Sequence, residues 1–348
     1  MKFVEAEAGI EPTYTALQAA CESQGNRGDA HSSGNIVWRV LAGFRPSKPL
    51  YIPSRRAFLA TLAALPIAAR ASMASGLVDR RTLFSFAYQM EGVDDLLFRP
   101  REAIDLNGML RESGRVCLPA GDFVTWPVYV RSGDVIEGQG IRTRVWVTGR
   151  GIQPEDESRP TEYVQLRDFD LCCDNRGEAD QHALWLSACR EWTVERVRAV
   201  NFGGAGAYLY GKRTPTGGLD PTDTTRCAFR QFASWGCRYG MVFGGTPADP
   251  VVRGGTSNMN RAERCLSFWA ELDAFALLQG AANVLDQCVA GNSGGDGMRI
   301  AWYGNDVRLA VLERNEGYGI RKVRREWSDR TTVTYHSGGN NGLGDTNY

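Results

Sequence analysis

The sequence is poor in histidine and has no excess of charge of either sign. Its 348 residues include 3 His, and 40 Lys and Arg are balanced by 40 Asp and Glu. So few histidines argue against a metal centre built on imidazole, and no C-x-x-C pair supplies a zinc pattern. The balanced charge argues against nucleic acid as a partner.

Long hydrophobic runs are also missing, so no transmembrane segment is expected. The apolar run over residues 57–69 is too short to span a bilayer. It follows Arg55-Arg56 and precedes Ala69-Arg70-Ala71, and residues 50–74 as a whole resemble a twin-arginine export signal. The alternative is a buried N-terminal helix. The signal implies a periplasmic or extracellular protein and makes residues 1–49 a spurious extension, in which residues 7–18 look like a translated transfer-RNA gene.

Glycine, in contrast, is abundant, and its 40 residues follow no collagen-like period. That excess predicts many turns between short strands. Residues 80–115 are expected to form a linker and a capping helix, the helix covering residues 101–113. Its candidate buried positions are Ile104, Leu106, Met109 and Leu110.

Short apolar segments then recur along the chain. The residues just before them are His182, Ala205, Tyr239, Asp273, Asp296 and Tyr318. The intervals are about 22 residues, and two of them are longer by about a dozen, as expected for the coils of a solenoid. A leucine-rich or ankyrin array would need a Leu-Asn signature or helix-length partners, and a two-domain α/β fold would need helical patterns between the strands.

The motifs LPAGDF (residues 118–123) and SGDVIEGQG (residues 132–140) identify the solenoid class. They resemble the opening coils of the pectate-lyase-like right-handed parallel β-helix superfamily. The fold prediction is therefore all-β: a single-stranded right-handed parallel β-helix over residues 116–323, with an irregular tail over residues 324–348.

One interior position of the predicted coils carries two cysteines. Eight residues before the recurring position stand Val197, Gln231, Cys265, Cys288 and Ala310. We expect Cys265 and Cys288 to stack as buried small hydrophobes, and a disulfide is compatible with an exported protein but not required.

The outward position two residues into each strand predicts a substrate-binding face. It is occupied by Trp185, Tyr208, Val242, Ala276, Arg299 and Arg321. Aromatic faces suit sugar rings, and arginine forks suit the carboxylates of uronic acids. The alternative is that the aromatics cover the sheet and the arginines are solvated. Tyr239 and Tyr318 extend the candidate binding set, and insertions over residues 212–225 and 246–261 are expected to wall a groove.

Asp273 and Asp296 are the candidate catalytic residues. They occupy the same position on adjacent coils, which predicts carboxylates about 5 Å apart. Mutual repulsion would leave one of them protonated, as a general acid must be. Residues 292–298 (NSGGDGM) resemble the N-T-D-G segment of polygalacturonase-like members, although the G-D-D, G-H-G and R-I-K motifs are missing. An aspartate beside glycine also suits a turn for backbone reasons alone.

Two further sites are weaker candidates. His182 is a candidate acid or base, or else a hydrogen-bonded turn residue. Asp168, Asp170 and Asp174 could bind Ca²⁺ if the protein is a lyase, or could be solvated turn acids.

Together these features predict an exported enzyme that cleaves a polysaccharide, with an acidic, uronate-containing glycan as the substrate and hydrolysis or β-elimination as the reaction. The alternative is a non-catalytic glycan-binding or adhesive surface protein. Apart from Ca²⁺ in the lyase case, no cofactor is predicted.

Overall fold

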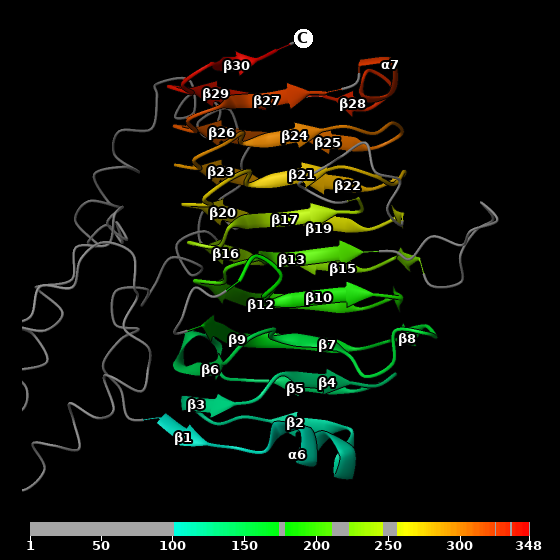
Figure 1. Cartoon of the computed structure of the whole chain (residues 1–348), viewed down its shortest axis with the longest axis vertical. Coiled ribbons are helices and arrows are strands. Elements are labelled where there is room, and N and C mark those ends of the chain that lie inside the picture. Colours follow the sequence, from blue (N-terminus) through cyan, green and yellow to red (C-terminus); the bar gives the residue numbers. More distant parts are fainter. Residues whose placement is uncertain are drawn as a thin grey trace, which may run out of the picture. The chain divides into compact units, whose positions relative to one another are not determined.

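The chain folds into a parallel β-solenoid whose coils stack from α6 at one end to β30 at the other (Figure 1). The computed structural model describes residues 101–173, 178–210, 223–245, 256–323, 325–334 and 336–347. The export signal and the N-terminal extension lie outside these residues. So do most of both insertions and Asp174. No helix in the described part of the chain is long and apolar enough to span a membrane.

Three sheets form the sides of the coils, and every strand pairing among the described residues is parallel. Sheet A has 17 strands, sheet B has nine and sheet C has four within those residues. The strands of sheet B are β4 (Val128–Val130), β7 (Ile152–Pro154), β10 (Leu184–Ser187), β13 (Ala205–Tyr210), β17 (Tyr239–Phe243), β21 (Phe275–Leu277), β24 (Met298–Ile300), β27 (Tyr318–Lys322) and β30 (Gly344–Thr346). Those of sheet C are β8 (Thr161–Glu162), β11 (Cys189–Arg190), β14 (Thr224–Thr225) and β18 (Ser257–Asn258).

Sheet A has the most strands. It consists of β1 (Arg101–Ala103), β2 (Arg115–Cys117), β3 (Gly121–Thr125), β5 (Val135–Glu137), β6 (Thr143–Val147), β9 (Gln165–Cys173), β12 (Thr193–Val200), β15 (Ala228–Arg230), β16 (Ala233–Trp235), β19 (Arg261–Glu263), β20 (Leu266–Phe268), β22 (Val284–Asp286), β23 (Val289–Gly291), β25 (Asp306–Arg308), β26 (Ala310–Glu313), β28 (Thr332–Val333) and β29 (His336–Gly339). The short 3₁₀ helix η2 (Gly140–Arg142) precedes β6, and helix α7 (Arg325–Ser328) lies in the last coil.

Residues in the left-handed conformation stand at the corner where successive coils enter sheet A. The same corner is taken in successive coils by Tyr163, Glu191, Arg226, Met259, Ala282 and Gly304, with φ between 55° and 69°. A single left-handed residue reverses the side-chain alternation and changes the strand direction. For residues other than glycine it costs about 1–2 kcal/mol, which the stacking of equivalent corners must offset.

The core is the continuous interior of the coils. Its sheet B column is Leu184, Ala207, Met241, Phe275, Met298 and Ile320, which the strand register brings side by side and which are all buried. This register confirms the repeat predicted from the sequence. Burial of these side chains against the coils above and below is the main favourable term in a solenoid.

The capping helix is shorter than predicted. α6 spans Leu106–Ser113, and residues 101–103 form β1 instead. Asp105 caps the helix by accepting a hydrogen bond from the Gly108 N–H at 2.9 Å, so the helix cannot begin earlier. Leu106 and Leu110 are buried as expected, whereas Met109 is exposed.

Two other predictions about the coils need correction. Gln231 is not an interior residue: it has φ of 55° and turns outward, and the buried Phe232 fills the column beside Cys265. Strands β28, β29 and β30 continue all the way into residues 324–348, where an irregular tail was expected.

Cys265 and Cys288 lie inside the core on neighbouring coils, as predicted, and no described cysteine forms a disulfide. Burial raises the pKa of the Cys265 thiol well above its usual range.

Candidate functional site

The outer face of sheet B carries the predicted binding residues in the predicted order. The outward column, Trp185, Tyr208, Val242, Ala276, Arg299 and Arg321, is paired residue by residue across β10, β13, β17, β21, β24 and β27. Trp185 and Tyr208 are therefore neighbours, and so are Arg299 and Arg321. The corner column, His182, Ala205, Tyr239, Asp273, Asp296 and Tyr318, runs beside it at the start of the same strands.

Three side chains of the corner column accept hydrogen bonds from the backbone of the next coil. Asp273 Oδ1 accepts from the Asp296 N–H at 3.0 Å, and Asp296 Oδ1 accepts from the Tyr318 N–H at 2.9 Å. His182 Nδ1 accepts from the Ala205 N–H at 2.8 Å. These bonds satisfy buried amides that no strand pairing reaches, so the three residues also hold the coils together.

Glycines before the corner make this close approach feasible. A Cβ at Gly295 would lie 2.8 Å from Asp273 Oδ1, and a Cβ at Gly317 would lie 2.4 Å from Asp296 Oδ1. Both distances are too short for a side chain. Gly295 of the NSGGDGM motif and Gly317 in the next coil therefore each accommodate the carboxylate of the preceding coil.

The other oxygen of each aspartate faces an arginine of the outward column. Asp273 Oδ2 lies 3.0 Å from Arg299 Nε, and Asp296 Oδ2 lies 3.7 Å from Arg321 Nη1. The Arg299 guanidinium also bonds to the Tyr239 hydroxyl. The result is two Asp–Arg pairs on consecutive coils, flanked by the half-buried rings of Tyr239 and Tyr318.

Burial controls the protonation of this cluster. Desolvation raises the pKa of Asp273 and of Asp296 above the usual range, opposed in part by Arg299 for Asp273 and by the Tyr318 N–H for Asp296. The charge of Asp273 raises the pKa of Asp296 further. Asp296 lies farther from its arginine than Asp273 does, so the attraction that opposes protonation is weaker at Asp296.

An aromatic cluster occupies the other part of the face. The Trp185 ring stacks with His182 at 5.2 Å and with Tyr210 at 5.1 Å. Its indole N–H donates to Glu157 Oε1 at 3.0 Å, and the Arg150 guanidinium lies 5.1 Å from its ring centre. Trp185 is thus held firmly while staying partly accessible.

Tyr208 does not present its ring to solvent as predicted. Its side chain is 5% exposed and packs over the outward column, and its hydroxyl donates to the Gly245 carbonyl oxygen. Tyr210, two residues further along β13, lies at the edge of the cluster instead. Strand alternation places Tyr208 and Tyr210 on the same side of the sheet, but only tertiary contacts decide which of them stays accessible.

His182 is poorly suited to proton transfer. Desolvation and the nearby Arg150 lower its pKa to about 3, so the ring is neutral across the ordinary pH range. Nδ1 accepts a backbone hydrogen bond, so the ring proton is on Nε2. The geometry agrees with the alternative expected from the sequence, in which His182 is a hydrogen-bonded turn residue.

Asp168 and Asp170 do not form a cation site. Asp168 pairs with Arg196 through two oxygens at 2.6 and 2.8 Å, and Asp170 pairs in the same bidentate way with Arg198. Arginines already neutralise both carboxylates, and Asp170 is buried together with Arg198. No cluster of three or more Asp, Glu, His or Cys side chains suited to a metal ion occurs in the described part of the chain.

No family model and no curated protein matches the sequence of the chain. Solved structures do resemble it. The catalytic domain of a GH87 alpha-1,3-glucanase in complex with tetrasaccharides has a TM-score of 0.38 and 10% identity, and the same domain with nigerose has 0.35 and 10%. Each match covers 70% of this chain and 65% of the glucanase domain, so the chain spans about two thirds of that length. ORF18 of Geobacillus virus E2 has a TM-score of 0.20 and 13% identity over 67% of this chain. At this level the likeness does not extend to function.

Proposed function

We propose that the outer face of sheet B binds a polysaccharide chain and that Asp273 and Asp296 hydrolyse it. The observation that carries this proposal is the pair of buried carboxylates at equivalent positions on consecutive coils. Each accepts a backbone hydrogen bond from the next coil through one oxygen and faces an arginine of the outward column through the other.

The separation of the two carboxylates fits glycoside chemistry. Because both make the same contact with the next coil, they repeat at the strand spacing of about 4.8 Å. Glycosidases that retain configuration place their two carboxyl groups about 5–5.5 Å apart. In this proposal Asp296 protonates the glycosidic oxygen as the glycosidic bond breaks, and Asp273, which lies 3.0 Å from Arg299, attacks the anomeric carbon or stabilises the positive charge that develops on the sugar. A water molecule then completes the hydrolysis.

Sugar-binding groups flank this pair along the direction of stacking. Trp185 and Tyr210 lie in the coils on one side of the aspartates, and Tyr318 and Arg321 lie on the other. Arg321 is 47% exposed and 3.7 Å from Asp296, so its outer N–H groups face solvent and can take a uronate carboxylate. The substrate class we propose is therefore an acidic glycan, bound across several coils.

Binding without cleavage is the second candidate function. It is favoured by the hydrogen bonds themselves, because Asp273, Asp296 and His182 all serve the same structural purpose at equivalent positions. A non-catalytic glycan-binding protein would need only the aromatic cluster and the exposed arginine.

A panel of uronate and neutral polysaccharides tests the two functions. New reducing ends with no unsaturated product support hydrolysis, and absorbance from unsaturated sugars would instead indicate β-elimination. The assay is run with and without Ca²⁺. Retention of a polysaccharide without any product supports the binding protein, and neither retention nor product contradicts both proposals.

A further inference from the structure

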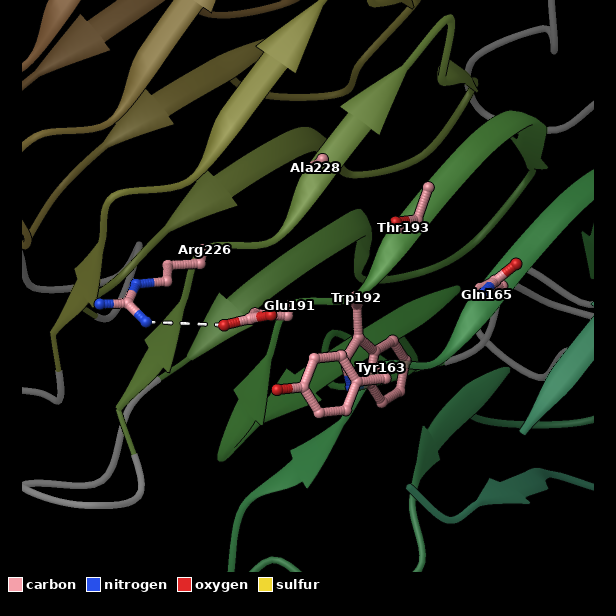
Figure 2. Close-up of a pocket in the computed structure, with 7 residues that line it drawn as sticks. All are labelled: Tyr163, Gln165, Glu191, Trp192, Thr193, Arg226 and Ala228. Atoms are coloured by element: carbon pink, nitrogen blue, oxygen red, sulfur yellow. Dashed lines mark ion pairs between the residues drawn. The ribbon is translucent and has the colours of Figure 1, made fainter. Parts of the chain in front are cut away.

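A hollow lies at a different corner of the coils, where sheet C turns into sheet A. It has a volume of about 400 Å³ and spans three coils (Figure 2). The residues lining it are Tyr163, Gln165, Glu191, Trp192, Thr193, Arg226 and Ala228. None of them belongs to the face of sheet B described above.

The strand register explains why this corner is hollow. Three residues at the start of sheet A form the floor of the hollow and are paired across successive coils: Gln165, Thr193 and Ala228. Their side chains become shorter from one coil to the next. Arg261, which pairs with Ala228 in the following coil, has a long side chain and does not line the hollow. The depression therefore lies over the short side chains of Thr193 and Ala228.

The left-handed corner residues form its wall. Tyr163, Glu191 and Arg226 have φ of 59°, 55° and 57°, and their side chains project outward. Tyr163 is 57% exposed, which is unusual for a ring on a folded surface. Behind it the fully buried Trp192 donates its indole N–H to the Thr161 carbonyl oxygen at 2.9 Å and gives the corner a rigid base.

One acidic and one basic side chain line the hollow, so it carries no net charge. Glu191 and Arg226 form an ion pair at 3.5 Å, drawn in Figure 2 at one side of the hollow, with Gln165 and Thr193 at the other. Both members of the pair are substantially exposed and keep free hydrogen-bonding capacity. An anionic ligand would have to compete with Glu191 for Arg226, whereas a neutral polyol can bond to both groups at once.

We infer that this hollow is a binding site for a neutral oligosaccharide, separate from the cleavage site. An exposed ring offers a surface for the apolar face of a sugar, and an amide, a hydroxyl, a carboxylate and a guanidinium surround it to bond hydroxyl groups. The inference rests on the proposed function for the choice of saccharides, and the site would hold a polymer on the solenoid away from Asp273 and Asp296.

The test measures binding of neutral gluco-, manno- and xylo-oligosaccharides and of uronate oligosaccharides by titration calorimetry. It uses the full chain carrying Asp296→Asn, so that no ligand is cleaved. We expect Tyr163→Ala to weaken binding of at least one neutral oligosaccharide about tenfold, and Tyr163→Phe to preserve it. Tyr303→Ala is the matched control, since Tyr303 is 36% exposed and does not line the hollow, and it should leave binding unchanged.

Each possible result either supports the inferred binding site or overturns it. Unchanged affinity in Tyr163→Ala, equal losses in the Tyr163 and Tyr303 variants, or Tyr163-dependent binding of uronates alone would overturn the inference, as would failure of every neutral oligosaccharide to bind. Tyr163-dependent binding in a chain that cleaves no polysaccharide would leave this site standing and remove the proposed function. Cleavage of a polysaccharide by the parent chain, together with unchanged oligosaccharide binding in Tyr163→Ala, would support the proposed function and rule out this binding site.

Discussion

Asp273 accepts a hydrogen bond from the backbone of Asp296 at 3.0 Å, and this contact links two candidate catalytic residues through the fold itself. One carboxylate is positioned by the strand that carries the other. Any chemistry at this corner therefore depends on the stacking of coils. Each aspartate has a structural role, as a hydrogen-bond acceptor for the next coil, and a proposed chemical role, and mutation can separate the two.

Replacing Asp296 separates its structural role from its charge. Asp296→Ala leaves the Tyr318 N–H unsatisfied, and we expect it to lower the free energy of unfolding by about 1–3 kcal/mol. Asp296→Asn keeps an acceptor oxygen and, at neutral pH, should be at least as stable as the parent chain, because burial disfavours the ionised carboxylate. Denaturant unfolding measures both, and equal destabilisation by Asn and Ala would disprove the capping role.

His182 predicts a specific acid sensitivity. Its pKa is about 3 in the folded chain and near 6.5 when unfolded, so between these values only the unfolded state binds the proton. Stability should therefore fall as the pH drops from about 6.5 toward 3, by about 1.4 kcal/mol for each pH unit at most. His182→Asn should remove this part of the pH dependence. Identical pH profiles of melting temperature for the two chains would contradict the prediction.

The left-handed corner offers a matched pair of substitutions. Ala282 has φ of 58° and Gly304, one coil later, has φ of 69°. Ala282→Gly should relieve backbone strain and raise stability by about 1 kcal/mol, and Gly304→Ala should lower it by a similar amount. The comparison uses thermal unfolding of the two variants, and a shift of the same sign in both would show that backbone strain does not control this corner.

Arg321 tests the choice of an acidic substrate. Arg321→Ala removes the exposed guanidinium and should weaken uronate binding about tenfold or more while leaving neutral saccharides unaffected. Arg308, which is also exposed and pairs with Asp306 on sheet A, provides a control in Arg308→Ala. Equal effects of the two variants on uronate affinity would indicate a general charge effect.

The spacing of the repeat was sufficient to predict the outward column from Trp185 to Arg321, because a parallel coil fixes one residue beside its equivalent in the next. It failed at Gln231, because that coil is one residue shorter: eight residues separate the left-handed Gln231 from Tyr239, whereas nine separate the left-handed Arg264 from Asp273. The interior place therefore falls to Phe232. The burial of Tyr208 and the Asp–Arg pairing depend on side chains reaching between coils. Periodicity places such side chains on a face but does not determine their partners.

The most direct test of the central claim compares the parent chain with Asp296→Asn on the polysaccharide panel. We expect reducing ends from the parent chain, a loss of at least about a hundredfold in the variant, and a melting temperature of the variant no lower than that of the parent, which shows an intact fold. Product release at the same rate from both chains, or none from either on any polysaccharide, would contradict hydrolysis at Asp273 and Asp296.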